Sequence, residues 1–469
     1  MTFIQVEFIW FYLAVFSAYW LVRNRVAQNA LLIVASGVFY GWVHPFWLVL
    51  LYISAIVDYL AGISMERWPA RKNLVLFVSL ATNVGILSYY KYADFFLENL
   101  DAALTAAGMP DAVGPIGVLL PAGISFYTFQ SMAYSIDIWR GELKARRNIL
   151  EYLLAVSFFC HLVAGPVQRA SNLLQQAEHE RRFSWAMVRS GFGLAMWGAF
   201  KKIVCADTVS PYVDKILALP DPSAGMVWAA VLGFTVQILA DFSGYSDIAR
   251  GTARMLGWDL MLNFNHPYLA TSPSEFWRRW HISFSTWIRD YLYFSFGGSR
   301  GGVGRTVGAT YAAMLISGLW HGASWNFVLW GAYHATLTVA YRFLTPLVPK
   351  GFRESQLGHV LAVAWMFVLT VFGWLLFRVT DVSRITALLR LDPFGGTPAQ
   401  AAAAVTMLAI AALAAAPLLA ALAWETWVAP RIAESPWRLP IQTTAWAAFA
   451  CTFFVFQRMA GNDFIYFQF

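Results

Sequence analysis

Hydrophobic segments of about 20 residues recur along the whole chain, and this feature limits the possible folds more than any other. Only 13% of the 469 residues are charged, whereas a soluble protein carries about a quarter. Backbone groups in lipid must form their hydrogen bonds within the protein, and these segments lack the alternation of barrel strands. The sequence therefore predicts an all-α polytopic membrane protein with one integral-membrane domain over residues 1–469.

Two kinds of apolar segment are expected. Residues 149–166 and 276–296 fit simple spans poorly, and we expect them to be re-entrant or interfacial helices. The first apolar segment follows no basic region and contains no cleavage site of small residues, so we expect it to be a retained span. The twelve predicted transmembrane helices are residues 4–22, 29–43, 46–63, 73–92, 116–138, 187–205, 224–243, 307–321, 323–341, 357–377, 403–424 and 441–457.

The basic residues predict the orientation of these spans. With the N-terminus outside, 24 of the 33 lysine and arginine residues fall in inner loops and four in outer loops, which places both termini outside. The basic segment from Arg378 to Arg390 is typical of a cytoplasmic loop, although this assignment places it outside. An error of one span after Phe377 would therefore move the C-terminus to the inner side. The net charge of +7 is thus spread over many loops, and nucleic-acid binding is not expected.

Several functional classes are not expected from the motifs. The sequence has no Gly-x-x-x-x-Gly-Lys-Ser/Thr loop, which argues against an ATP-driven pump. The eight histidines include no His-x-x-x-His pair, and the three cysteines lie far apart, so we expect no metal site and no disulfide framework.

The most informative stretch runs from residue 272 to residue 326. Ser272, Pro273 and Glu275 form a capping box that predicts the start of a helix. We expect one amphipathic helix to follow, with an apolar stripe formed by Trp277, His281, Phe284 and Ile288. A histidine on such a stripe is more often a core residue than a catalyst. His321 lies inside a hydrophobic segment, where an ionisable group is costly and is a functional candidate.

Other polar residues also occur in apolar segments. One interpretation is that they form hydrogen bonds between helices, and the other is that they line a polar path through the membrane interior. They include Tyr127, Gln130, Tyr134, Asp137, Asp241, Ser243, Tyr245, Asp247, Asn263, Asn265 and His266.

Six motifs occur in the order PAGISFYTFQSMAYSIDIWRG, HLVAGPVQR, FKKIVCADT, DFSGYSDIARG, EFWRRWHISFSTWIRDYLY and GLWHGASWNFVLWG. This series resembles the membrane-bound O-acyltransferase family, in particular its bacterial branch of alginate O-acetylation and peptidoglycan O-acetyltransferase membrane proteins. The similarity covers nearly the whole chain, with the core motifs in residues 116–341. It implies tilted helices around a central tunnel through a thinned membrane region.

The resemblance also implies a reaction. An acyl group, most often acetyl from acetyl-CoA, passes from the cytoplasmic side to an exported or cell-envelope polysaccharide outside. The chain would then lie in the bacterial inner membrane, with no bound cofactor, and would act with a periplasmic SGNH-type acetyltransferase or a polysaccharide-modification complex. The alternatives are D-alanyl transfer to teichoic acid and a non-catalytic acyl-group transporter whose histidines only form hydrogen bonds.

The family's motifs assign roles to particular residues. His321 matches the histidine held to be catalytic, and a neutral buried imidazole suits a general base. His281 would be a second base, an orienting partner or a donor-side contact, and the two roles could be exchanged. Tyr466, in the aromatic C-terminal motif 464–469, would be an acyl relay or part of an aromatic belt at the interface. Tunnel-lining candidates are Gln130, Asp241, Ser243, Tyr245, Asn265, Trp320 and Asn326, and donor-side candidates are Arg278, Arg279 and Arg300.

Overall fold

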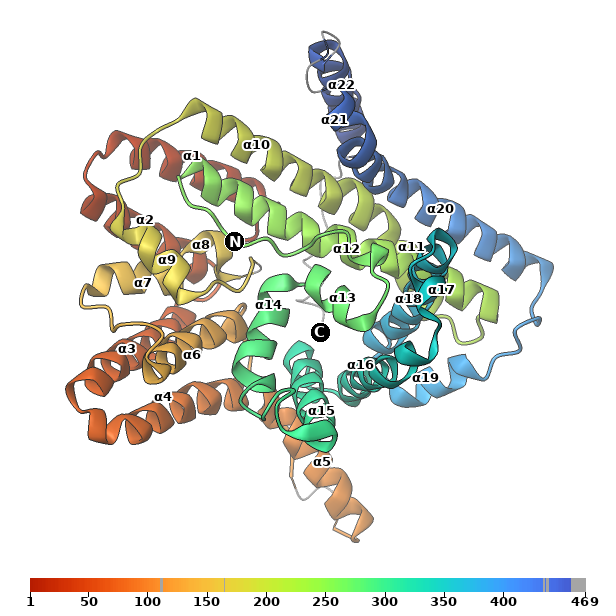
Figure 1. Cartoon of the computed structure of the whole chain (residues 1–469), viewed down its shortest axis with the longest axis horizontal. Helices are drawn as coiled ribbons and strands as arrows, with labels where there is room; N and C mark the ends of the chain where they lie inside the picture. The colour runs from red at the N-terminus through yellow and green to blue at the C-terminus, as the bar shows by residue number, and fades with distance from the viewer. Residues whose placement is uncertain (110–112, 164, 433–434, 436–437, 457–469) are drawn as a thin grey trace. The chain divides into compact units, whose positions relative to one another are not determined.

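The computed structural model describes residues 1–109, 113–163, 165–432, 435 and 438–456, and Tyr466 lies outside this described part. Within it every regular element is helical, as predicted (Figure 1). In chain order the α-helices are α1 (Val6–Leu21), α2 (Arg25–Gly41), α3 (Phe46–Arg67), α4 (Lys72–Leu87), α5 (Ala93–Ala106), α6 (Ile124–Arg140), α7 (Ile149–Ser157), α8 (Phe159–Leu162), α9 (Ala170–Glu178), α10 (Trp185–Phe200), α11 (Asp207–Leu217), α12 (Ala224–Met255), α13 (Pro273–Arg279), α14 (Ile282–Trp287), α15 (Gly302–His321), α16 (Trp325–Leu344), α17 (Lys350–Arg353), α18 (Gln356–Arg378), α19 (Val382–Leu389), α20 (Pro398–Ala423), α21 (Ala429–Ile432) and α22 (Arg438–Phe456).

Each of the twelve predicted spans overlaps one of these helices, which confirms that these segments are helical. In the part of the chain that the structure describes, five helices are both long and apolar enough to cross a membrane, so the number of spans stays a prediction. They are Phe46–Arg67, Pro69–Ala106, Ala224–Met255, Gln356–Arg378 and Pro398–Ile432.

The contacts divide the chain into two units, each built from several segments of sequence. Unit 1 contains Met1–Ala195, Ile248–Leu262 and Thr286–Ser295. Unit 2 contains Met196–Asp247, Asn263–Ser285 and Phe296–Phe469. Both units are therefore assembled from segments that lie far apart in the sequence.

Helices α3, α4 and α6 pack together in unit 1 (Figure 1). The buried carboxylate of Asp58 on α3 joins them, because it accepts hydrogen bonds from Ser79 and Asn83 on α4 and from Ser135 on α6. A buried charge is costly unless it is hydrogen-bonded, and these three donors meet that requirement. The predicted re-entrant stretch 149–166 begins with two helices, α7 and α8, that are separated at Phe158.

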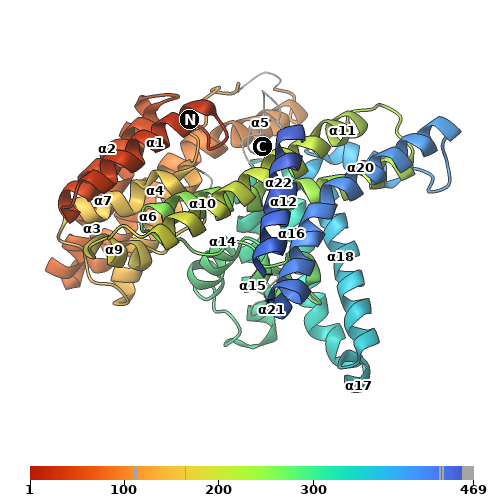
Figure 2. The same cartoon turned by 90° about the horizontal axis from the view of Figure 1, so that it is seen from above.

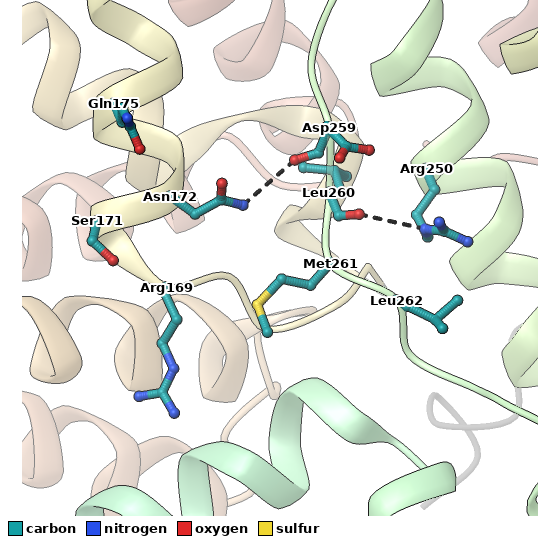
Figure 3. Close-up of a pocket in the computed structure, with 9 residues that line it drawn as sticks. All are labelled: Arg169, Ser171, Asn172, Gln175, Arg250, Asp259, Leu260, Met261 and Leu262. Atoms are coloured by element: carbon teal, nitrogen blue, oxygen red, sulfur yellow. Dashed lines mark hydrogen bonds between the residues drawn. The ribbon is translucent and has the colours of Figure 1, made fainter.

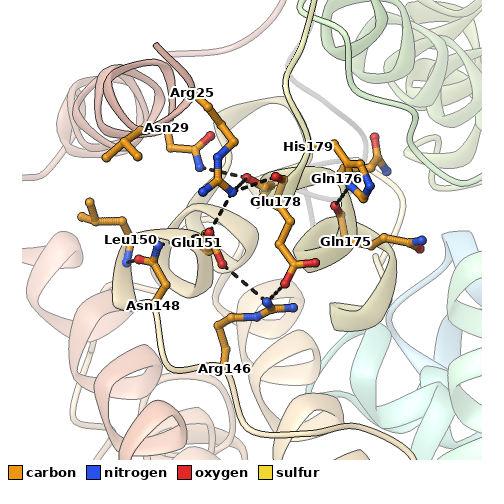
Figure 4. Close-up of polar contacts among 12 residues, drawn as sticks. Arg25, Asn29, Arg146, Asn148, Leu150, Glu151, Gln175, Gln176, Glu178 and His179 are labelled. Atoms are coloured by element: carbon orange, nitrogen blue, oxygen red, sulfur yellow. Dashed lines mark hydrogen bonds and ion pairs between the residues drawn. The ribbon is translucent and has the colours of Figure 1, made fainter.

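A second polar cluster in unit 1, the Glu151 cluster, joins α2, α7 and α9 (Figure 4). The carboxylate of Glu151 is buried and accepts hydrogen bonds from Arg25 at 3.0 Å and from Arg146 at 3.5 Å. Arg25 also donates to the backbone carbonyl of Glu178 at 2.8 Å, and Arg146 forms an ion pair with the Glu178 carboxylate. The cluster fixes the C-terminal end of α9 against the N-terminal ends of α2 and α7.

In unit 2, α15 and α16 form a helical hairpin, and α18 packs against α16 (Figure 1, Figure 2). The hairpin is tight because two glycines face the opposing backbone. A side chain at Gly318 would collide with the carbonyl group of Phe327, and one at Gly331 would collide with that of Met314. This close approach places His321, the last residue of α15, beside the first turns of α16.

Candidate active site

The helix start predicted at Ser272 is confirmed. The Ser272 hydroxyl accepts the backbone N–H of Glu275 at 3.3 Å, and Pro273 occupies the first helical position. The Glu275 carboxylate bonds to the N–H of Thr271 at 2.9 Å and to Arg279 at 2.8 Å. Burial opposes ionisation of Glu275, but these hydrogen bonds lower its pKa to about 2.

The single helix predicted over residues 276–296 is wrong, because the chain leaves the helix at Trp280 and begins α14 at Ile282. A non-local segment causes the break. The carbonyl group of Asn263 accepts the N–H of Ile282 at 2.9 Å, and the N–H of Asn265 donates to the carbonyl group of Arg279 at 2.9 Å. These bonds replace those that a continuous helix would make with its own preceding turn.

His281 lies at this break with φ of 44°, in the left-handed region that is unfavourable for most residues. The conformation costs about 1–2 kcal/mol, which the two hydrogen bonds on either side of His281 offset. As a result His281 does not follow the helical stripe predicted with Trp277 and Ile288. Residues in such conformations often occur at functional sites.

The imidazole of His281 is fully buried and is held by Asn263, which sequence reasoning did not connect with it. Nδ1 of His281 lies 3.0 Å from Oδ1 of Asn263. The same Oδ1 accepts the Ser283 hydroxyl at 2.8 Å and the Ser283 backbone N–H at 3.4 Å. Nδ2 of Asn263 donates to the Ser246 hydroxyl at 3.1 Å. All four side chains are buried.

This arrangement determines the tautomer of His281. A backbone N–H is only a donor, so the atom of Asn263 that faces Ser283 is the oxygen, and Nδ1 of His281 must donate its proton to it. Nε2 then carries a lone pair, and it has no hydrogen-bond partner among the described residues. His281 lies outside the five long apolar helices, and burial lowers its pKa to about 3, which keeps it neutral. Nε2 of His281 is thus a buried proton acceptor.

His321 is also buried and shares an aromatic shell with His281. Its ring centroid lies 5.0 Å from that of Trp330 and 5.2 Å from that of Phe377. Phe284 contacts both imidazoles, at 4.9 Å from His281 and 5.6 Å from His321. Trp320, one of the predicted lining residues, likewise contacts both, at 5.9 and 5.0 Å. The structure therefore brings the two predicted histidines into one apolar site in unit 2.

Three predicted lining residues contact two buried lysines instead of an open path. Lys202 forms ion pairs with Asp241 at 2.7 Å and Asp207 at 2.8 Å, and it lies 5.8 Å from the ring centroid of Tyr245. Lys201 donates to Ser243 at 2.9 Å and forms an ion pair with Asp247 at 2.6 Å. These contacts favour the interpretation that the polar residues of this region join helices.

The remaining candidates lie in different surroundings. Asn326 donates to the carbonyl groups of Leu376 and Phe377, which fixes the end of α18 beside His321. Arg279 is occupied by Glu275 and by the carbonyl group of Asn265, whereas Arg278, Arg300 and the Asn265 side chain are exposed. Gln130 lies in unit 1 and donates to the carbonyl group of Ala155 at 2.5 Å.

Comparisons with known proteins agree on one family. Residues 141–379 match the membrane-bound O-acyltransferase family. A probable alginate O-acetylase of Azotobacter vinelandii is 38% identical over 393 residues, which cover 81% of this chain and 76% of that protein. A peptidoglycan O-acetyltransferase of Helicobacter pylori is 29% identical over 400 residues, covering 78% and 74%. A teichoic acid D-alanyltransferase of Bacillus subtilis is 24% identical over 270 residues, covering 54% and 68%.

Proposed function

Because the chain belongs to the membrane-bound O-acyltransferase family, we propose that this multi-pass membrane enzyme transfers acetyl groups from acetyl-CoA to hydroxyl groups of an exported or cell-envelope polysaccharide. The names of its alginate- and peptidoglycan-acetylating relatives support an acetyl group and a polysaccharide acceptor. We place the protein in the bacterial inner membrane with both termini outside. The donor then binds from the cytoplasm and the acceptor lies on the outer side.

The observation that carries this proposal is the pair of buried histidines in one aromatic site. In the transfer step an acceptor hydroxyl oxygen forms a bond to the acetyl carbonyl carbon, and the C–S bond of the thioester breaks. His321 takes the hydroxyl proton as general base and passes it to the departing thiolate. His281, whose Nε2 is an acceptor, orients the acceptor hydroxyl group or serves as a second base. The aromatic shell limits access of water, which would otherwise hydrolyse the thioester.

The route to the polysaccharide includes a relay in this proposal. Tyr466 first accepts the acetyl group as a phenyl ester, and a periplasmic SGNH-type acetyltransferase then transfers it to the sugar. A phenol is a better leaving group than a sugar hydroxyl, so the relay divides one difficult transfer into two easier ones. The relay requires Tyr466 to be labelled before the polysaccharide.

Labelling of the purified protein with radioactive acetyl-CoA tests the proposal. Wild type, His321→Ala and Tyr466→Phe are compared for label retained on the protein and for release of CoA. We expect label on the wild type alone. Label on Tyr466→Phe but not on His321→Ala would support acetyl transfer and refute the tyrosine relay. No label and no CoA release from any variant, with the partner present, would refute acetyl-CoA as the donor.

D-alanyl transfer is the second candidate, supported by the similarity to a teichoic acid D-alanyltransferase. The two candidates differ in the acyl group and in its carrier. Feeding the same protein a D-alanyl carrier protein distinguishes them. Transfer from that donor, with none from acetyl-CoA, would establish the second candidate.

A further inference from the structure

Three buried ring nitrogens in unit 2 have no hydrogen-bond partner among the described residues. They are Nδ1 of His334, Nε1 of Trp330 and Nε1 of Trp277. The cleft of about 620 Å³ in unit 1 differs, because its polar groups contact one another and their neighbours (Figure 3). There, for example, Asn172 donates to the carbonyl group of Asp259 at 3.4 Å. Buried polar groups normally have a partner, so the three ring nitrogens require an explanation.

The three rings contact one another. The ring centroid of His334 lies 4.7 Å from that of Trp330 and 5.0 Å from that of Trp277, and the two indoles are 5.7 Å apart. Trp277 lies on α13, whereas Trp330 and His334 lie one turn apart on α16, which packs against α13 (Figure 1). The nitrogens without partners therefore belong to one small group of rings.

This group of rings adjoins the proposed general base. Trp330 contacts His321 at 5.0 Å on one side and His334 at 4.7 Å on the other, so its indole is the wall between the two imidazoles. His334 is thus a third buried histidine of the aromatic site. The transfer step described above does not use it.

The free nitrogens offer hydrogen-bond donors. An indole Nε1–H is only a donor, and a neutral imidazole has one N–H group. Nε2 of His334 faces the backbone of α18, since a β-carbon at Gly373 would lie only 3.0 Å from it. Nδ1 is therefore the nitrogen of His334 that is left for a ligand. Several donors in one small buried region match an oxygen atom on which negative charge develops.

This arrangement is unfavourable for the fold alone. A buried donor without a partner has lost its hydrogen bonds to water and gained none in exchange. Phenylalanine would fill the same apolar positions without that loss. Donors that are in place before charge develops need no reorganisation during the reaction, which is a known source of catalysis.

We propose that Nε1–H of Trp330 and Nδ1–H of His334 bind the carbonyl oxygen of the acyl group transferred beside His321, with Nε1–H of Trp277 as a further donor. This inference rests on the proposed function and adds the groups that stabilise its transition state. When the acceptor hydroxyl oxygen bonds to the carbonyl carbon, the π electrons of the C=O bond move to oxygen, and these N–H groups donate to the oxyanion. The C=O bond forms again as the C–S bond breaks, and the hydroxyl proton passes through His321 to the thiolate.

Steady-state acetyl transfer from acetyl-CoA by the folded full-length protein tests the role of Trp330. Trp330→Phe should lower kcat and kcat/KM equally, by about 10²- to 10³-fold, because the donor acts in the transition state. Trp20→Phe is the matched control. Nε1–H of Trp20 donates to the carbonyl group of Met255 at 3.2 Å in unit 1, so this variant should keep the kcat of the wild type. A kcat of folded Trp330→Phe within about 3-fold of the wild type would overturn the proposal.

Three variants at His334 test the assigned nitrogen and do not depend on Trp330. The side-chain amide of asparagine lies near the position of Nδ1, and that of glutamine lies near the position of Nε2. His334→Asn should therefore keep kcat within about 10-fold of the wild type, whereas His334→Gln and His334→Phe should lose about 10²- to 10³-fold. Equal kcat values for the three variants would overturn the proposal.

The same measurements separate this inference from the proposed function. An active wild type with unimpaired Trp330→Phe and His334→Phe would overturn the inference alone. Failure of the wild type to transfer acetyl would overturn the proposed function and, with it, this inference.

Discussion

Replacing Asn263 with alanine should impair catalysis through His281 without touching either histidine. The variant removes the acceptor of the His281 Nδ1–H at 3.0 Å and the partners of the Ser283 and Ser246 hydroxyl groups at 2.8 and 3.1 Å. A buried polar group without a partner costs about 1–3 kcal/mol. With Nδ1 no longer anchored, the imidazole is free to rotate or to change tautomer. We expect kcat to fall about 10²- to 10⁴-fold, the range of a misplaced acid–base group.

Asn263→Asp separates positioning from packing. The carboxylate still accepts the Nδ1 proton, so much of kcat should be retained. Its negative charge favours the imidazolium and raises the pKa of His281 from its value of about 3. Because the proposed mechanism uses the neutral imidazole of His281, the acidic limb of the pH–rate profile should move to higher pH. The measurement is label transfer from acetyl-CoA between pH 5 and pH 8.

The matched control is Asn83→Ala. Asn83 is a buried amide in unit 1 that bonds to Ser54 at 2.5 Å and to Asp58 at 2.7 Å. The Asn83→Ala variant should lose about as much stability as Asn263→Ala, while kcat and the pH–rate profile of its folded form stay unchanged. The reasoning is refuted if folded Asn263→Ala keeps kcat within about 3-fold of the wild type, a change below 1 kcal/mol. An unchanged pH profile in Asn263→Asp would refute the assigned tautomer.

Three further predictions concern stability. The pKa of His281 is about 3 in the folded protein and about 6.5 in the unfolded chain, so the free energy of unfolding should fall as pH drops from 6.5 toward 3, by up to about 1.4 kcal/mol per pH unit. Thermal unfolding of His281→Gln should lack this contribution. Equal slopes of stability against pH for the wild type and His281→Gln would contradict the assigned neutrality. Glu151→Ala should destabilise by about 1.5–3 kcal/mol because two partly exposed arginines of the Glu151 cluster lose their shared carboxylate, although Arg146 keeps its ion pair with Glu178. Denaturant unfolding should show less than about 1 kcal/mol for Glu354→Ala, whose pair with Lys350 is exposed. Gly318→Ala should lower the apparent Tm because the new methyl group meets the backbone of α16. Gly308→Ala, on the same helix, faces open space and should be neutral or stabilising. Similar Tm values for the two variants would mean that the hairpin of α15 and α16 is not tightly packed.

The sequence by itself determined the class of the protein and singled out two histidines, His281 and His321, as candidates for the site. Long apolar segments can satisfy their backbone only as helices, so the positions of the predicted spans follow from local composition. The start of α13 also follows from neighbouring residues alone, because Ser272 and Pro273 act within the first turn of that helix. His321 was conspicuous because an ionisable group is rare in an apolar segment.

Tertiary structure decided how those residues are held. His281 leaves its helix because the 263–265 segment supplies backbone partners from outside that helix, and helical periodicity contains no information about them. The same segment places Asn263 on His281, 18 residues away, and so selects the nitrogen that can accept a proton. Lys201 and Lys202 lie within or at the edge of a predicted span, and only folding pairs them with carboxylates on α12. Hydrophobicity is a property of a segment, whereas a buried hydrogen bond requires two groups that only the folded chain brings together.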